Sequence, residues 1–339
     1  MKVTIYPRNL DNGSIQVNPY IRDFVSALEQ EGIVVANPPH KNPLFSLIGR
    51  QTDSDAYIFH WLENVPDYKY GMLQTLAALW LLITIKFNRK RIIWFLHNKQ
   101  PHVARHQWAK KLLTHLLISK SDLIVTHATE GVAVIRNRCR DAESKTLFLH
   151  HPTKNRMPAQ AVNAQTTDTD LLIWGNISRY KGVAEFIRFA NEHSLKLKIK
   201  VIGKCSSADL FEELKQQANP YISIENRSIR FDELSKEIQK TRYVLVPYAT
   251  ESVLSSGILM DSLSFGARVI GPNIGSFKDY ANEPLLCVHT FDSFSEIAPI
   301  ANHATRHANP DDYRLFLEKH SWKEFGKAFH YQLQKLTQQ

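Results

Sequence analysis

The stretch Pro247–Gly275, PYATESVLSSGILMDSLSFGARVIGPNIG, decides how this chain folds. An apolar run at Tyr243–Val246 precedes it and predicts a strand that ends in a polar loop. The loop closes on Ser255–Gly257, and an apolar stretch over 258–265 then predicts a short helix that stops at Gly266. A strand, a polar loop and a helix in this order form the repeating unit of a parallel α/β sheet.

The start of that helix has the composition of an anion site. The N–H groups of a first helical turn lack intrahelical acceptors, and the helix dipole is positive at this end. Hydroxyl side chains and a glycine allow a phosphate to come close to the backbone. The sequence therefore predicts a pyrophosphate site at Ser255, Ser256 and Gly257.

Strands and helices alternate on both sides of this stretch, which predicts parallel sheets with covered faces. In the first half we predict strands at 3–6, 33–35, 56–60, 91–96 and 123–126, and helices at 19–31, 71–87 and 105–119. In the second half we predict strands at 171–174, 198–202, 222–225, 243–247 and 268–270, and helices at 183–193, 209–217 and 232–240. These two series indicate two Rossmann-like α/β domains whose parallel sheets face each other across a cleft.

A polar, proline-containing segment separates the two series. We predict an N-terminal domain over residues 1–155, a linker over 156–170 and a C-terminal domain over 171–320. For the last helix, residues 321–339, we hypothesise packing against the N-terminal domain.

A second anion-binding feature lies in WGNISRYKG, residues 174–182, between a predicted strand and a predicted helix. Ligands of such sheets bind at the carboxyl ends of the strands, where Arg179 and Lys181 would lie. Both cations suit a diphosphate, Arg by bidentate contact and Lys as a point charge. The alternative is that they are solvated loop cations. Because a second candidate phosphate site ends another strand of the same sheet, we favour binding.

In the first half, predicted strands end on or next to His60 and His97, and His102 follows in the second of these loops. Imidazole titrates near neutrality, so such residues suit sugar or phosphate contacts and proton transfer. A structural role is the alternative, and among the three we favour a catalytic role for His97. The loop after the first strand contains Gly13 and Asn18, which either contact the ligand or form only a turn and a helix cap.

Composition limits the remaining possibilities. The three cysteines are far apart, which argues against disulfides and a zinc site, and MKVTIYP at the start is not a secretory leader, so a cytoplasmic location is expected. Asp53-x-Asp55 and Asp168-x-Asp170 resemble metal-binding pairs, but the first precedes a strand and the second lies in the linker. We therefore predict no metal site and no bound cofactor.

The net charge of +9 lies in the first half, where residues 1–160 hold 21 Lys and Arg against 12 Asp and Glu; residues 161–339 hold 21 of each. Such asymmetry suggests an anionic partner for the first domain. The apolar segment 72–87 is too short to span a bilayer, so we expect a buried or interfacial helix. The segment 105–120 combines Trp and Leu with Arg and Lys, which fits either an anionic membrane surface or a core-facing helix, and the charge asymmetry favours the membrane.

An ordered set of short pieces resembles the GT-B glycosyltransferases, which have two Rossmann-like domains. The similarity is to family 4 and, more closely, to the bacterial exopolysaccharide transferases that include the xanthan β-mannosyltransferase. The pieces are Asn18-Pro19-Tyr20, His60-Trp61 with Glu63, His97-Asn98 with Pro101-His102, Arg179-Tyr180-Lys181-Gly182, Pro247-Tyr248, and Ser256-Gly257 with Leu263-Ser264 and Gly266.

This resemblance implies that Arg179 and Lys181 neutralise the diphosphate leaving group and that His97 lies beside the donor sugar. In family 4, two glutamates stand eight residues apart near the late helix; here Asp261 takes the second position and Val253 the first. Asp261 would therefore contact the nucleotide.

The implied activity is transfer of a sugar from a UDP- or GDP-sugar to a lipid-linked oligosaccharide, at the inner face of the cytoplasmic membrane, during assembly of bacterial surface polysaccharide. One rival is a non-hydrolysing nucleotide-sugar epimerase, which would need a carboxylate-rich cleft. The other is a basic nucleic-acid-binding protein, but the first half contains no recognisable reading module. We therefore expect a nucleotide-sugar, a lipid-linked acceptor and an anionic membrane as partners, and no nucleic acid.

Overall fold

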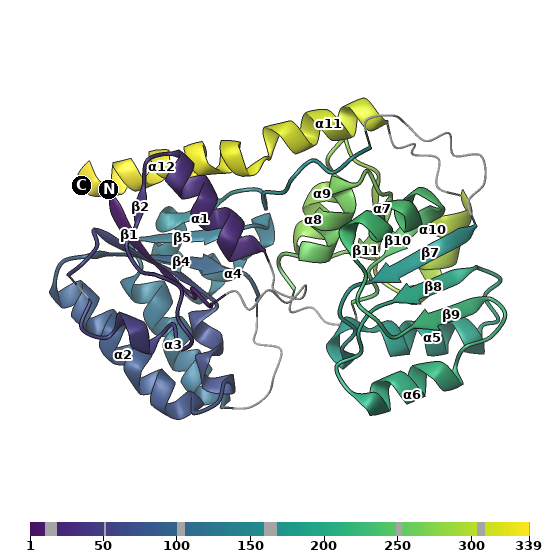
Figure 1. Cartoon of the computed structure of the whole chain (residues 1–339), viewed down its shortest axis with the longest axis horizontal. Helices are drawn as coiled ribbons and strands as arrows, with labels where there is room; N and C mark the ends of the chain where they lie inside the picture. The colour runs from purple at the N-terminus through teal and green to yellow at the C-terminus, as the bar shows by residue number, and fades with distance from the viewer. Residues whose placement is uncertain are drawn as a thin grey trace. The chain divides into compact units, whose positions relative to one another are not determined.

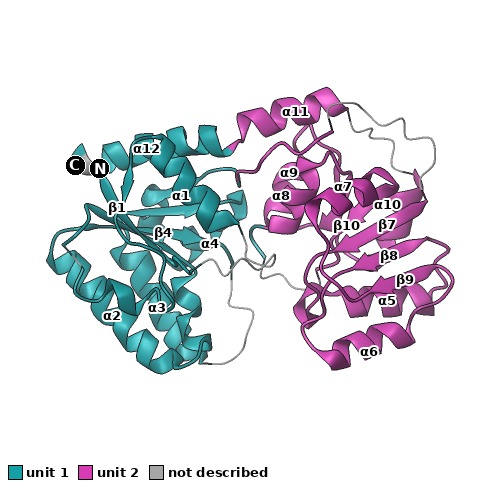
Figure 2. Cartoon of the chain, in the orientation of Figure 1, with its two compact units in different colours: residues 1–151, 252–255, 322–339 teal, residues 152–251, 256–321 magenta. Residues whose placement is uncertain are grey.

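The computed structural model of the chain describes residues 1–10, 19–50, 52–99, 106–158, 168–248, 253–303 and 309–338. It divides into two compact units (Figures 1 and 2). Unit 1 comprises Met1–His151, Ser252–Ser255 and Trp322–Gln339, and unit 2 comprises Pro152–Glu251 and Ser256–Ser321. The last helix thus belongs to unit 1, although it follows unit 2 in the sequence.

Unit 1 is built on a six-stranded parallel sheet with the order β2-β1-β3-β4-β5-β6. Its strands are β1 (Lys2–Tyr6), β2 (Val34–Val35), β3 (Ala56–His60), β4 (Arg91–Leu96), β5 (Leu123–Thr126) and β6 (Thr146–Phe148). All five residues of β3 and all four of β5 are buried, as expected for central strands that are covered on both faces.

Helices cover both faces of this sheet. They are α1 (Tyr20–Gln30), α2 (Gly71–Phe87), α3 (Gln107–Lys120), α4 (Thr129–Arg138) and α12 (Trp322–Gln338). Helices α1 and α12 share one core cluster with strand residues such as Ile58 and Phe95. Helices α2, α3 and α4 share the cluster on the other face, with Tyr57 and Trp94.

Unit 2 contains a second six-stranded parallel sheet, with the order β12-β11-β10-β7-β8-β9. Its strands are β7 (Thr169–Trp174), β8 (Ile199–Ile202), β9 (Ile222–Glu225), β10 (Thr241–Leu245), β11 (Val269–Pro272) and β12 (Val288–Phe291). Its helices are α5 (Val183–Glu192), α6 (Ala208–Gln216), α7 (Phe231–Gln239), α8 (Gly257–Ser264), α9 (Gly275–Ala281), α10 (Ile297–His303) and α11 (Pro310–Lys319).

The strand order of unit 2 places the ligand edge. From β7 the chain builds outward to β8 and β9, then returns to β10 on the other side of β7 and continues outward to β12. The carboxyl ends of β7 and β10 therefore flank a topological switch point, where open α/β sheets bind their ligands. Helices α5, α6 and α10 share one core cluster with the sheet, and α8 lies on the opposite side of the sheet from α5 (Figure 1).

Candidate functional site

The N-terminus of α8 lies at this switch point, and the helix begins at Gly257, one residue before the predicted start. Ser256 is the N-cap, and its buried Oγ accepts a hydrogen bond from the Leu259 N–H at 3.3 Å. The hydroxyl of Tyr248, three residues past β10, lies 3.4 Å from the same oxygen. Gly257 opens the helix and is exposed. Outside its own turn and chain neighbours, no heavy atom of the described residues lies within 4 Å of where a Cβ would stand on it. Ser255 immediately precedes this cap and is half-buried.

The loop after β7 packs against the first turn of α8. Gly175 has φ +94°, and a Cβ there would lie 3.1 Å from Cδ1 of Ile258. One residue earlier, Trp174 donates from Nε1 to the Oγ of Ser262 at 2.9 Å, which fixes the end of β7 against α8. The β7 loop and the helix N-terminus thus form one site, here named the α8 site: residues 175–182 with Tyr248, Ser256 and Gly257.

Lys181 supplies a cation to the α8 site. It ends a 3₁₀ turn, Arg179–Lys181, and its Nζ donates to the backbone oxygen of Asn176 at 2.6 Å. Burial lowers the pKa of this ammonium to about 8. Among the described residues no carboxylate forms an ion pair with it. The ammonium of Lys181 is half-buried, and its hydrogen-bond acceptor is the backbone oxygen of the residue after Gly175. Such a cation is suited to bind an anionic ligand.

Arg179 has a different environment. Its Nη1 lies 2.8 Å from Oε2 of Glu213 on α6, and Arg188 holds the other oxygen of that carboxylate at 3.0 Å. The guanidinium is mostly exposed, so this surface ion pair is weak and can be exchanged for a phosphate. Arg179 thus belongs to the α8 site, but its guanidinium is paired with a carboxylate.

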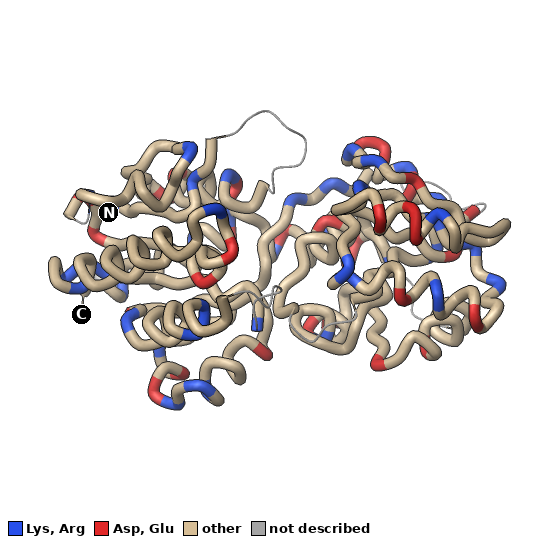
Figure 3. Tube along the Cα trace, turned by 90° about the horizontal axis from the view of Figure 1, so that it is seen from below, with Lys and Arg blue, Asp and Glu red and all other residues tan. Residues whose placement is uncertain are grey.

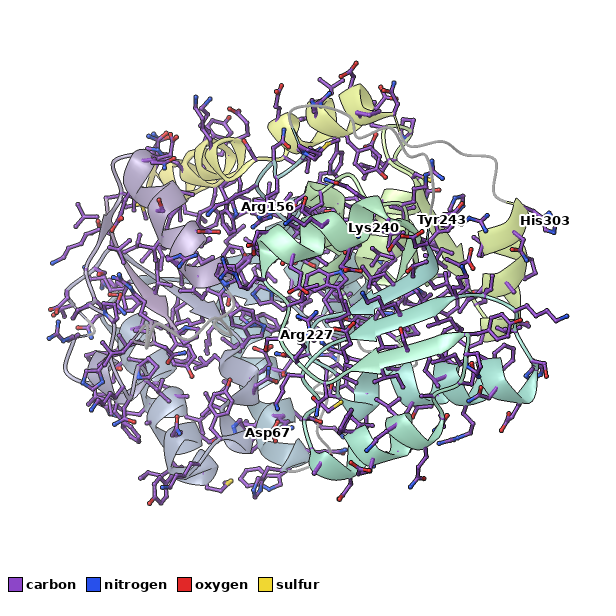
Figure 4. The ribbon with its side chains drawn as sticks, turned by 45° about the vertical axis from the view of Figure 1, so that its right-hand side comes forward. Asp67, Arg156, Arg227, Lys240, Tyr243 and His303 are labelled. Atoms are coloured by element: carbon purple, nitrogen blue, oxygen red, sulfur yellow. The ribbon has the colours of Figure 1, made fainter. Side chains whose placement is uncertain are left out.

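Asp261, expected at the nucleotide, forms an ion pair with Arg156 at 3.3 Å. The same guanidinium donates to Oγ of Ser264 at 2.9 Å and lies 4.6 Å from the ring centre of Phe231 at the start of α7. Arg156 is labelled in Figure 4. Sequence reasoning did not single out Arg156, because it lies in the segment assigned to a linker. Arg227, which follows β9, forms ion pairs with Glu225 and Glu233.

In unit 1, His97 belongs to a cluster of buried histidines. His60 ends β3, and His97 and His127 directly follow β4 and β5. Nδ1 of His60 lies 3.0 Å from Nε2 of His97, and the hydroxyl of Tyr20 lies 2.7 Å from Nε2 of His127. His127 also contacts the backbone oxygen of Leu149 through Nδ1, at 2.8 Å. The cluster gathers the carboxyl ends of three neighbouring strands around one tyrosine of α1.

Burial lowers the pKa of His60, His97 and His127 well below the ordinary value, and the neighbouring histidines lower it further. All three are therefore neutral at pH 7. His97 is 6% exposed and stacks on Trp61, with 4.3 Å between ring centres. Its catalytic role stays a prediction. His127 was not singled out from the sequence, although it ends a predicted strand just as His97 does.

Three of the predicted site positions, Gly13, Asn18 and His102, lie outside the described residues.

The two D-x-D pairs take part in structural contacts. Asp55 accepts from the Lys2 N–H at 2.8 Å, and Asp170 pairs with Arg242 at 3.0 Å. Across the described ranges, no group of three His, Cys, Asp or Glu residues is arranged to hold a metal ion.

No family model and no curated protein matches the chain. Solved structures with a similar fold include Anabaena HepE in complex with UDP-glucose, at a TM-score of 0.66 and 11% identity over 99% of this chain and 100% of that one. The lipopolysaccharide outer core galactosyltransferase WaaB matches with a TM-score of 0.65 and 11% identity, over 98% of this chain and 100% of that one. AviGT4, a glycosyltransferase involved in avilamycin A biosynthesis, matches with a TM-score of 0.59 and 15% identity, over 99% of this chain and 97% of that one.

These similarities extend over both units, and they confirm the predicted GT-B fold of two Rossmann-like domains. At such low identity they establish the fold alone. The closer resemblance to family 4 and to the xanthan-type transferases stays a prediction.

Proposed function

We propose that this protein is a glycosyltransferase that takes its sugar from a nucleotide diphosphate sugar bound at the α8 site. The observation that carries the proposal is the meeting of two positive features at the switch point of unit 2. Lys181, without a carboxylate partner among the described residues, contacts Asn176, and the adjacent Gly175 packs on the first turn of α8. A diphosphate is the ligand that satisfies both features.

The chemistry follows from where charge develops. When the bond between the sugar and the diphosphate breaks, negative charge grows on the leaving phosphate. The first N–H groups of α8 and the ammonium of Lys181 would stabilise that charge. Stabilisation of developing charge by fixed dipoles and cations is usually the largest single contribution to the rate enhancement. Arg179 would join them by exchanging Glu213 for a phosphate oxygen. These groups suffice without a metal ion, so we propose metal-independent transfer.

For the donor we propose a UDP- or GDP-sugar. We favour UDP because Anabaena HepE, which has a similar fold, was crystallised in complex with UDP-glucose. For the acceptor we propose a lipid-linked oligosaccharide in bacterial surface polysaccharide assembly. The excess of Lys and Arg in residues 1–160 supports an acceptor carrying phosphate. WaaB, which shares the fold, is a lipopolysaccharide outer core galactosyltransferase. Such an acceptor places the protein on the inner face of the cytoplasmic membrane.

A thermal-shift titration tests the donor proposal. A ligand that binds only the folded protein stabilises it, by about 2.7 kcal/mol at a hundredfold excess over Kd. We expect UDP to raise Tm more than GDP, dTDP, ADP or CMP, with the same shift in magnesium and in EDTA. No shift with any nucleotide would remove the proposed donor site. A shift that EDTA abolishes would leave the site but refute metal independence.

Gly257→Ala separates ligand binding from folding at the same site. Outside its own turn, a Cβ on Gly257 meets no atom of the described residues within 4 Å, and alanine favours a helix over glycine, by about 1 kcal/mol in a helix interior and by less at its first residue. We therefore expect an unchanged or slightly higher Tm without ligand. The new methyl enters the space assigned to the diphosphate, so UDP affinity in calorimetry should fall at least threefold. Wild-type affinity in the folded variant would place the phosphates elsewhere.

A further inference from the structure

Helix α2 has two apolar faces, and the sheet covers one of them. Its buried stripe contains Ala78, Leu82 and Ile85, which pack in the core of unit 1. A second stripe points outward at intervals of three and four residues and is between 46% and 85% exposed: Leu73, Leu76, Trp80, Ile83 and Phe87. Intervals of three and four place residues on one side of a helix.

The exposed apolar surface continues onto α3. Helices α2 and α3 lie side by side on the same face of the sheet, so their outward sides form one surface (Figure 1). Trp108 and Leu112 of α3 are 61% and 38% exposed. Leu113 and Leu117 of α3 face the core instead and are fully buried. We name the five outward residues of α2, together with Trp108 and Leu112, the α2–α3 patch.

The charge around the α2–α3 patch has one sign. No Asp or Glu occurs between Asp67 and Asp122, a stretch that holds ten Lys and Arg residues. Both boundary carboxylates are neutralised, Asp67 by the buried Lys110 and Asp122 by two further cations. Elsewhere, in unit 2, acidic and basic residues are interspersed (Figure 3).

Several cations of this stretch have no carboxylate in ion-pair range among the described residues. Lys69 precedes α2, Arg89 and Lys90 follow it, and Lys111 and Lys120 lie on α3. Exposed apolar side chains surrounded by such cations have the composition of a surface that enters an anionic lipid interface.

We propose that the α2–α3 patch docks the protein onto the surface of an anionic lipid bilayer. Helix α2 would lie in the plane of the interface, with its inner stripe on the sheet and its outer stripe among the acyl chains. Within the described ranges, no helix is both long and apolar enough to cross a membrane. A symmetric contact with a second copy is disfavoured, because it would oppose two basic surfaces that contain no acidic partner.

The docking surface deepens the proposed function, since a lipid-linked acceptor is reached from the bilayer, but its test is independent of catalysis. The full-length protein is floated with vesicles of phosphatidylcholine alone or mixed with phosphatidylglycerol, at low and high salt. We expect binding to the anionic vesicles and a decrease in high salt.

The variant Leu76→Gln/Ile83→Gln removes two exposed apolar side chains without touching the core. Vesicle binding should fall tenfold or more, because the interface buries each side chain. The matched control is Leu315→Gln on α11, a leucine 56% exposed in unit 2, which should bind like wild type. Replacing Lys69 and Arg89 with Gln should cost about fivefold for each charge on anionic vesicles.

Two outcomes would overturn the proposal: equal vesicle binding by the double variant, and a dimer in sedimentation that dissociates when Leu76 and Ile83 are replaced. UDP binding is measured on the same proteins. Loss of vesicle binding with wild-type UDP affinity supports the docking surface. UDP binding without any vesicle binding would refute the docking proposal and support the donor site. Vesicle binding without UDP binding would support the docking proposal and refute the donor site.

Discussion

Lowering the pH from 7 to 5.5 should reduce the free energy of unfolding by about 2 kcal/mol. The loss comes from His60, His97 and His127, whose pKa values burial holds well below the ordinary range, with the neighbouring histidines adding to the effect. Below about pH 6.5 the unfolded chain binds a proton at each position and the folded protein does not. Stability is thus present above this pH and lost as the pH falls, by somewhat more than about 1 kcal/mol for each histidine over this range.

Glu63 acts in the opposite direction. Burial raises its pKa to about 7, although Trp94 donates to it from Nε1 at 3.1 Å. As the pH falls from 7 to 5.5 this carboxyl becomes fully protonated in the folded protein but stays ionised in the unfolded chain, which stabilises the fold by about 1 to 2 kcal/mol. Three histidines lose about 4 kcal/mol together, and the difference is the expected net loss of about 2 kcal/mol. This loss is a large part of the free energy of unfolding of a typical folded protein, about 5–15 kcal/mol.

Urea unfolding followed by circular dichroism at the two pH values measures the loss. In His60→Phe one titrating group is removed from the cluster while the aromatic stacking on Phe95 is kept, so the loss should shrink to about 1 kcal/mol or less. The control His115→Gln replaces an exposed histidine of α3 and should retain the full loss. Equal stability of the wild type at both pH values, or an undiminished loss in His60→Phe, would contradict the assignment.

The central part of the fold could be predicted from the sequence because both faces of its strands are buried. The apolar runs 56–60, 91–96 and 123–126 match β3, β4 and β5 residue for residue, and 71–87 matches α2. The three-residue edge strand β6 (Thr146–Phe148) was missed, since its residues are only half-buried and the apolar run there, Leu147–Leu149, is short. Helix α9 was missed because it begins at Gly275 and has only seven residues.

Local features of the candidate site were also predictable, whereas its long-range contacts were not. A serine before an apolar helix indicates an N-cap, and Ser256 is one. The pairing of Asp261 with Arg156 joins residues from different parts of unit 2, and no local pattern indicates it. The two faces of α2 illustrate the same limit: its composition predicts a buried or interfacial helix, but only the packing tells which stripe the sheet covers.

Lys181→Ala should weaken UDP binding by about 1.5–3 kcal/mol, roughly tenfold to more than a hundredfold, which is the range for hydrogen bonds to charged groups. The ammonium contacts the backbone oxygen of Asn176, so the fold loses one surface hydrogen bond and Tm should change little. The matched control is Lys196→Ala, which removes an exposed cation just before β8, at the opposite edge of the same sheet. Wild-type affinity is expected for this control.

The pH dependence of binding then identifies the charge itself. Because burial lowers the pKa of Lys181 to about 8, the free protein is mostly charged there at pH 7 and mostly neutral at pH 9. A diphosphate binds the charged form, so UDP affinity should fall about tenfold from pH 7 to 9. In Lys181→Ala this decrease should vanish, and in Lys196→Ala it should persist. A decrease that survives in Lys181→Ala would belong to another group, and Lys181 would then not be the cation that meets the phosphates.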